Sequence, residues 1–217
     1  MQSIVSGFET ISRGGLMMIP LLISAFIALT IIIERTFVLH RTYKDSPRFV
    51  ADVFKLILAG QLDQALTTCK QTKTPIAAVL TAGLEHFKNP IEEMELSMKN
   101  QAEAWVPTLE RRIDVIDTVI TAAPLMGLLG TITGMMGSFQ VLSEKGVNEP
   151  NAITGGVAEA LIATATGLII ALFCLVAYNY LSTRIKLFIY EIESIASRLV
   201  EARLAAQRTH LRIERST

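Results

Sequence analysis

Three long stretches without charge, apart from one carboxylate, constrain this chain more than any other feature of its sequence. They cover residues 16–33, 118–143 and 152–183, and Glu159 is the single charged residue within them. About 20 apolar residues are enough to cross a bilayer core that is roughly 30 Å thick. The sequence therefore predicts an all-α, polytopic membrane protein with three transmembrane helices.

The cationic residues near these stretches predict the orientation of the chain, because loops on the cytoplasmic side carry the excess of lysine and arginine. The first fifteen residues hold one cation and the turn at 144–151 holds another, whereas the other flanks are rich in them. We therefore expect the chain's N-terminus to lie outside and its C-terminus in the cytoplasm. The second stretch then crosses from the cytoplasm to the outside. The expected segments are an outer N-terminal segment 1–15, transmembrane helices 16–38, 113–143 and 152–180, a cytoplasmic helical segment 39–112, an outer turn 144–151 and a cytoplasmic C-terminal helix 181–217.

Composition excludes several classes of protein. The chain is 51% hydrophobic and 18% charged with a net charge of zero, so nothing favours nucleic acid as a partner. Cys69 and Cys174 lie in very different surroundings and are not expected to form a disulfide. The three histidines have no metal-ligand spacing, and no catalytic constellation or phosphate-binding loop is present. We predict neither an enzyme nor a cofactor.

Prolines and glycines mark helix ends in the cytoplasmic segment. Three side chains able to accept an N-cap hydrogen bond each precede a proline that suits the first helical turn. These are Ser46, Thr74 and Asn89, and Asn89 also has Glu92 at capping-box spacing. Gly60 is a predicted C-cap.

Two helices are expected to extend beyond the bilayer. From Pro90 to Leu142 only Pro107, Pro124 and a few glycines interrupt the helical pattern, so one kinked helix is expected to run into the second span. The third span continues into an apolar stripe with heptad spacing, suited to packing inside a bundle or against another subunit. This stripe is Leu181, Ile185, Phe188, Ile192, Ile195 and Leu199.

Glu159 is the candidate functional residue, because a carboxylate inside a span costs ~2.5–3.5 kcal/mol or more and usually faces protein or water. The alternative is that Glu159 has no special role and extends its side chain to the nearby membrane surface. Thr166 follows seven residues later, within about 20° of the same helix face, whereas Thr164 lies roughly 140° away. A threonine in such a helix often bonds its own backbone, which also applies to Thr131 in the second span.

The second span also carries a face of small residues that would let another helix approach closely. Glycines recur on it at steps of three and four, at Gly127, Gly130, Gly134 and Gly137.

Several motifs resemble a known family. "APLMGLLGTITGMMGSF" (123–139) and "GGVAEALIATATGLIIAL…AYNY" (155–180) are similar to the two signature membrane helices of the MotA/TolQ/ExbB family. "KTPIAAVLTAGLEHF" (73–87), "LERRIDVIDTVITAAP" (109–124) and the "IIIER" exit from the first span resemble its other segments. The resemblance covers nearly the whole chain.

This resemblance implies a proton-driven energy transducer of the bacterial inner membrane, with protons as the coupling ion. It implies a homopentamer around a single-span partner that brings a membrane aspartate. Glu159 matches the family's membrane glutamate, and Thr131 and Thr164 match its threonines, all beside the proton route. Thr166 departs from the family, where an apolar residue is usual.

Within the family the chain looks most like the ExbB branch, which works with ExbD to energise TonB for outer-membrane uptake. The TolQ branch, which works with TolR in envelope integrity and division, is the alternative. MotA would be longer, with a fourth span. A passive membrane scaffold is a third hypothesis, and three spans without a repeat argue against a solute carrier.

Overall fold

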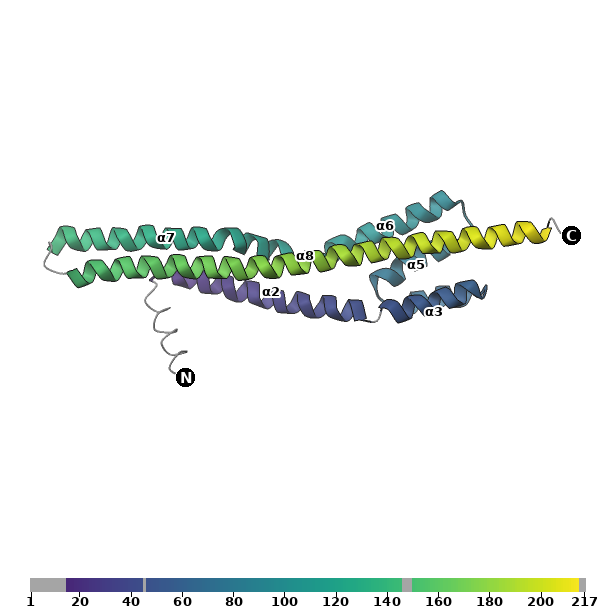
Figure 1. The fold of residues 1–217 in the computed structure, drawn as a ribbon, viewed down its shortest axis with the longest axis horizontal. Helices are drawn as coiled ribbons and strands as arrows, with labels where there is room; N and C mark the ends of the chain where they lie inside the picture. Colours follow the sequence, from purple (N-terminus) through teal and green to yellow (C-terminus); the bar gives the residue numbers. More distant parts are fainter. Residues whose placement is uncertain (1–14, 45, 146–149, 215–217) are drawn as a thin grey trace. The chain divides into compact units, whose positions relative to one another are not determined.

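The computed structural model describes residues 15–44, 46–145 and 150–214 (Figure 1). All regular structure in these ranges is helical, which confirms the predicted fold class. Three helical stretches are long and apolar enough to cross a membrane: Met18–His40, Ile113–Glu144 and Thr154–Ala206. The protein is therefore a multi-pass membrane protein. Most of the expected segment 1–15 and half of the turn 144–151 lie outside the described residues.

The chain divides into two compact units, of which the first comprises Met1–Arg35 and Arg112–Leu181. It contains most of helix α2 (Met18–Lys44), α7 (Ile113–Lys145) and the N-terminal part of α8 (Pro150–Glu214). In Figure 1, α7 runs alongside the green part of α8. The spans within these segments are predominantly apolar. A helix satisfies its backbone hydrogen bonds within one segment, as a hydrocarbon environment requires.

The second unit comprises Thr36–Arg111 and Ser182–Thr217. It contains α3 (Ser46–Leu58), α4 (Leu62–Gln71), α5 (Pro75–Glu85) and α6 (Ile91–Leu109), together with the C-terminal part of α8. The predicted heptad stripe of α8 is buried at all six positions, so its packing is within the chain. For example, the side chain of Leu199 lies against Gly83 of α5. The side chain of Met98 in α6 lies against the same glycine.

Two of the predicted helix ends are confirmed. Thr74 caps α5 by accepting a hydrogen bond from the Ala77 N–H at 3.3 Å, with Pro75 in the first turn. Gly60 follows α3 with φ +76°, and its N–H donates to the Ile57 carbonyl while the next N–H reaches back to Leu56. This pair of bonds is the Schellman arrangement that favours glycine.

The predicted cap at Asn89 is wrong. Pro90 has an extended ψ of 147° and is itself the N-cap residue, so α6 begins one residue later at Ile91. The Asn89 amide instead donates to the Glu93 carboxylate at 3.0 Å. The side chain of Ser46 lies outside the described part of the chain.

The expectation of one helix from Pro90 to Leu142 is also wrong. Pro107 and Pro124 lie inside helices, as expected, but α6 ends at Leu109 and α7 begins at Ile113. Arg112 between them has φ +66°, a left-handed conformation that cannot continue a right-handed helix. The break therefore comes from Arg112 and not from a proline.

The two cysteines are free, as predicted. Cys69 is buried in α4, and this burial raises the pKa of its thiol to about 11. Since the thiolate is the reactive form, Cys69 is expected to be an inert core residue.

Candidate functional site

Glu159 lies in α8, near the start of the third span, and its side chain is half-buried. Its carboxyl group rests against the backbone of Gly15, so that a Cβ added to Gly15 would overlap both Oε1 and Cδ of Glu159. The side chain therefore points toward the turn that precedes α2. Among the residues that the structure describes, no cation forms an ion pair with Glu159.

Small residues let α7 and α8 pack closely on both sides of Glu159 along the helix. A Cβ added to Gly127 would come within 3.0 Å of the Ala163 carbonyl oxygen, and one added to Gly130 within 2.6 Å of the Ala163 Cβ. At Gly134 the nearest atom is the carbonyl oxygen of Gly156, at 2.8 Å. The structure thus places three of the four predicted glycines against α8.

Gly137 differs from the other three. No described atom outside its own helix backbone lies within 4 Å of a Cβ built there. The spacing pattern included Gly137 because it is one turn beyond Gly134, but the contact with α8 does not extend to it.

The matching small residues of α8 were missed by sequence reasoning. Their spacing of four, three and four residues is the same signal that marked the glycines of α7, and it was present in the sequence. The close contacts on α8 are Gly156, Ala160, Ala163 and Gly167.

The three candidate threonines differ in what they bond. Thr164 donates across the helix pair to the Gly127 carbonyl at 3.0 Å. Thr166 donates to Ile162 in its own helix at 2.8 Å, and Thr131 to Leu128 in its own helix at 2.6 Å. Thr164 therefore joins α8 to α7, whereas the hydroxyls of Thr131 and Thr166 satisfy their own backbones. In the described chain, no hydrogen bond links any of the three to Glu159.

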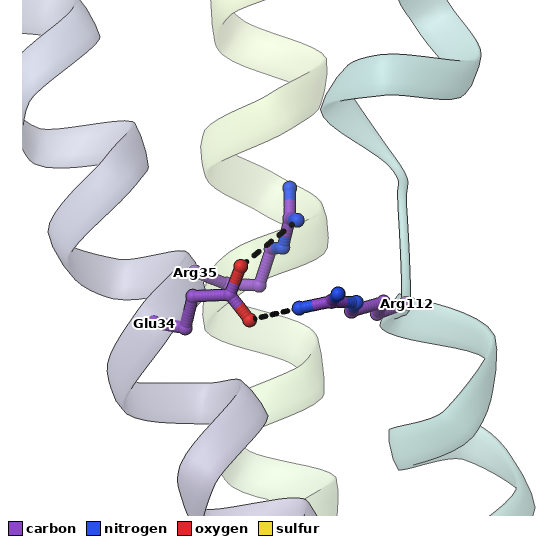
Figure 2. A network of polar contacts seen from close by, with 3 residues as sticks. All are labelled: Glu34, Arg35 and Arg112. Carbon is purple, nitrogen blue, oxygen red and sulfur yellow. Dashed lines mark hydrogen bonds and ion pairs between the residues drawn. The ribbon is translucent and has the colours of Figure 1, made fainter.

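At the opposite end of the first unit, an ionic cluster joins α2 to the start of α7. Figure 2 shows the Glu34 carboxylate between two guanidinium groups, with Arg112 at 2.6 Å and Arg35 at 3.5 Å. Arg35 is buried, while Glu34 and Arg112 are partly exposed. The cluster holds the end of the first span to the residue at which the α6–α7 break occurs.

Most of the apolar surface of the three spans is not covered by the chain itself. Only 22% of the most apolar window in the first span is buried, and 28% in each of the other two. Large side chains point outward from every span, including Phe26, Phe139 and Phe173. Because water would disfavour so much exposed apolar surface, lipid or other membrane helices must cover it.

Chemically, the site offers one carboxylate between apolar helices, with no partner cation among the described residues. The part of the chain that the structure describes contains no cluster of metal ligands. A carboxylate in such surroundings can exchange a proton or bind a cation.

The comparisons with known proteins agree with the fold. Residues 71–194 match the model of the MotA/TolQ/ExbB proton channel family. The chain is 33% identical over 168 residues to the ExbB-like 3 biopolymer transport protein of Synechocystis, covering 76% of this chain and 80% of that one. It is 30% identical over 185 residues to the Tol-Pal system protein TolQ of Haemophilus influenzae, covering 78% and 79%. It is 34% identical over 116 residues to ExbB of Aquifex aeolicus, covering 54% and 78%.

A match over more than half of the chain, joined to three membrane spans, identifies it: the protein belongs to the MotA/TolQ/ExbB proton channel family.

Proposed function

We propose that the protein is an ExbB-like proton-channel and stator subunit, which couples the proton motive force across the bacterial inner membrane to work on an envelope partner. The observation that carries the proposal is Glu159, a membrane carboxylate that packs against Gly15 and is the single charge within the stretches 16–33, 118–143 and 152–183. Keeping a charge there is costly, so a use for it is expected.

The uncovered surface of the spans supports a larger assembly. We propose a homopentamer around an ExbD-like, single-span protein that brings a membrane aspartate. The outward-facing residues of α7 and α8 would then contact neighbouring copies, the partner or the bilayer. The chain's N-terminus would lie in the periplasm and its C-terminus in the cytoplasm, as the cation distribution favours.

In this mechanism, protons pass from the periplasm to the cytoplasm between the oligomer and the partner's helices. Protonation of the partner's aspartate removes a buried charge and frees that helix from one wall of the channel. Glu159 supplies polarity and ion balance on the facing wall. Thr131 and Thr166 contribute hydroxyl oxygens, and Thr164 holds α8 against α7 through its bond to Gly127.

The test is to replace Glu159 by Gln and by Ala in cells that depend on this protein. Both variants are expected to assemble with the partner but to lose partner-dependent uptake across the outer membrane. Glu193→Gln, a change of an exposed carboxylate on the same helix, is the matched control and should retain uptake. If both Glu159 variants assemble and still support uptake, the protein is a passive scaffold.

A TolQ-like role is the second candidate, favoured by the 30% identity to TolQ over most of the chain. In that case the working companion is TolR-like, and the output is envelope integrity and division. Deleting the gene separates the two roles. Loss of TonB-dependent uptake with an intact envelope supports the ExbB-like role, and periplasmic leakage with intact uptake supports the TolQ-like role.

A further inference from the structure

Gly15 lies against the Glu159 carboxyl group. The overlap described above means that the carboxyl group fills the space where any side chain at position 15 would begin. Gly15 also has φ +71°, a conformation that residues with a Cβ rarely adopt. The positive φ therefore favours glycine at this position, and a side chain added there would force the end of the flexible Glu159 side chain to move.

The Gly15 turn is the start of the first membrane helix. The Gly15 carbonyl accepts a hydrogen bond from the Met18 N–H at 3.1 Å, and the Leu16 carbonyl accepts one from Ile19 at 3.3 Å. The first N–H groups of a helix have no acceptor within the helix, and the N-terminal end carries a partial positive charge. The Glu159 carboxylate thus lies where the backbone of α2 favours a negative charge.

Packing holds this turn in place. Met18 and Leu21 are buried, with exposed fractions of 4% and 0%. Met17 lies over the α7–α8 contact, because its Cβ would be 3.5 Å from a Cβ added to Gly130. The turn is therefore anchored on the same helix pair that carries Glu159, and it cannot move away from the carboxylate without disturbing that contact.

We propose that Gly15 is a positioning residue for Glu159. The turn without a side chain sets the height and direction of the carboxylate in the membrane, and it covers one side of the carboxyl group. Proton exchange then takes place on the side that faces away from α2. This role rests on the proposed function, in which Glu159 lies beside the proton route.

A rival explanation is that position 15 needs glycine only for its backbone conformation. Two substitutions separate the explanations. Asparagine adopts a positive φ far more readily than alanine, but both add a Cβ. If the carboxylate contact matters, Gly15→Ala and Gly15→Asn are both defective. If only φ matters, Gly15→Asn is close to wild type.

The experiment uses the full complex with its partner in proteoliposomes. Proton flux is measured after an acid pulse, and the infrared band of the Glu159 carboxyl group is identified by its loss in Glu159→Gln. We expect Gly15→Ala and Gly15→Asn to shift this band and to lower flux by about tenfold or more, because misplacing a reacting group by ~1 Å costs up to about 10²-fold. The control is Gly155→Ala, one turn before Glu159, where an added Cβ meets no described atom within 4 Å.

A second-site change keeps the test decisive if Gly15→Ala assembles poorly. Glu159→Asp shortens the side chain by one CH₂ group and withdraws the carboxylate from the added Cβ. Adding Gly15→Ala to Glu159→Asp should therefore cost much less, in assembly and in flux, than adding it to the wild type.

The proposal is overturned if Gly15→Ala leaves the carboxyl band unchanged, if Gly15→Asn restores flux, or if Glu159→Asp gives no rescue. Failure of the proposed function has a different signature. In that case Glu159→Gln itself retains flux, while the band shift caused by Gly15→Ala still reports the contact.

Discussion

One helix, α8, passes through both units of this protein and reverses its packing between them. In the first unit, as far as Cys174, its buried side chains are small, among them Ala160, Ala163 and Ala171, while Leu161, Leu172 and Phe173 point outward. In the second unit its large side chains are inside, as at Phe188 and Leu199, and most of its charged residues face out.

The difference shows which solvent each unit is built for. Lipid accepts large apolar side chains as readily as a protein core does, so membrane helices associate through small residues and close backbone contact. Water rejects those side chains, so a unit in water buries the large ones. Glu159 departs from this pattern, because it is a charged side chain within the third span. We therefore propose that the function of the protein depends on the first unit.

Replacing one phenylalanine in each unit should break this comparison most strongly. Phe188 is 1% exposed and Phe173 is 75% exposed, on the same helix. Phe188→Ala leaves a cavity in the second unit and is expected to lower the free energy of unfolding by about 3–5 kcal/mol. Phe173→Ala removes only outward-facing surface.

Thermal unfolding in detergent measures both variants, with proteolysis of the second unit as a second readout. Phe173→Ala is expected to unfold within a few degrees of the wild type. Equal destabilisation by the two variants would mean that the first unit also depends on large buried side chains.

Glycines of the first unit give the next largest effect. A Cβ on Gly167 would overlap the Ala123 carbonyl oxygen, a backbone atom that cannot turn aside. Gly167→Ala should therefore force α7 and α8 apart and cost about 1–3 kcal/mol. Gly137→Ala, which meets open space, should change stability by less than about 0.5 kcal/mol.

Urea or SDS titration of helix content distinguishes these two variants. The small-residue packing account fails if Gly137→Ala is the more harmful change.

Sequence reasoning predicted the elements of this fold but not their contacts. The three spans and the buried stripe follow from local hydrophobic patterning, and the Thr74 and Gly60 caps follow from the residue types at the helix ends. The break at Arg112 does not, because an arginine with positive φ is held there with a partner from α2, far away in sequence.

The site shows the same limit. Helix periodicity places Thr166 on the face of Glu159, yet it cannot tell which neighbour that face meets. In the structure, Thr164 forms the hydrogen bond between the helices. Glu159 contacts Gly15, a residue that precedes the first span. Periodicity carries no information about residues on another segment.

The two threonines of α8 sharpen the comparison at a smaller scale. Thr164→Val removes a bond between helices, which in membrane proteins averages about 0.6 kcal/mol. Thr166→Val removes a bond within α8 and should cost less. The acceptor at Gly127 is a backbone carbonyl, which no side-chain substitution removes, so a double-mutant cycle is not possible. The two valine variants are therefore compared directly by SDS titration. A greater loss in Thr166→Val would contradict the assignment.

The ionic cluster should have the smallest effect. Glu34 and Arg112 are partly exposed, so their pair is worth about 0.2–1 kcal/mol and is weakened by salt. Glu34→Gln is expected to lower stability slightly at low ionic strength, with the difference from the wild type shrinking in high salt. A salt-independent loss would show that the cluster acts through packing of the buried Arg35 instead.

The most direct test of the central claim is proton flux through the assembled complex in proteoliposomes, followed by a trapped pH dye. Glu159→Gln keeps the size and packing of the side chain but cannot ionise. The account predicts that flux falls by about tenfold or more, while Glu193→Gln leaves it unchanged. Wild-type flux in Glu159→Gln, in complexes that contain the partner at normal stoichiometry, would contradict the claim that this carboxylate serves the proton route.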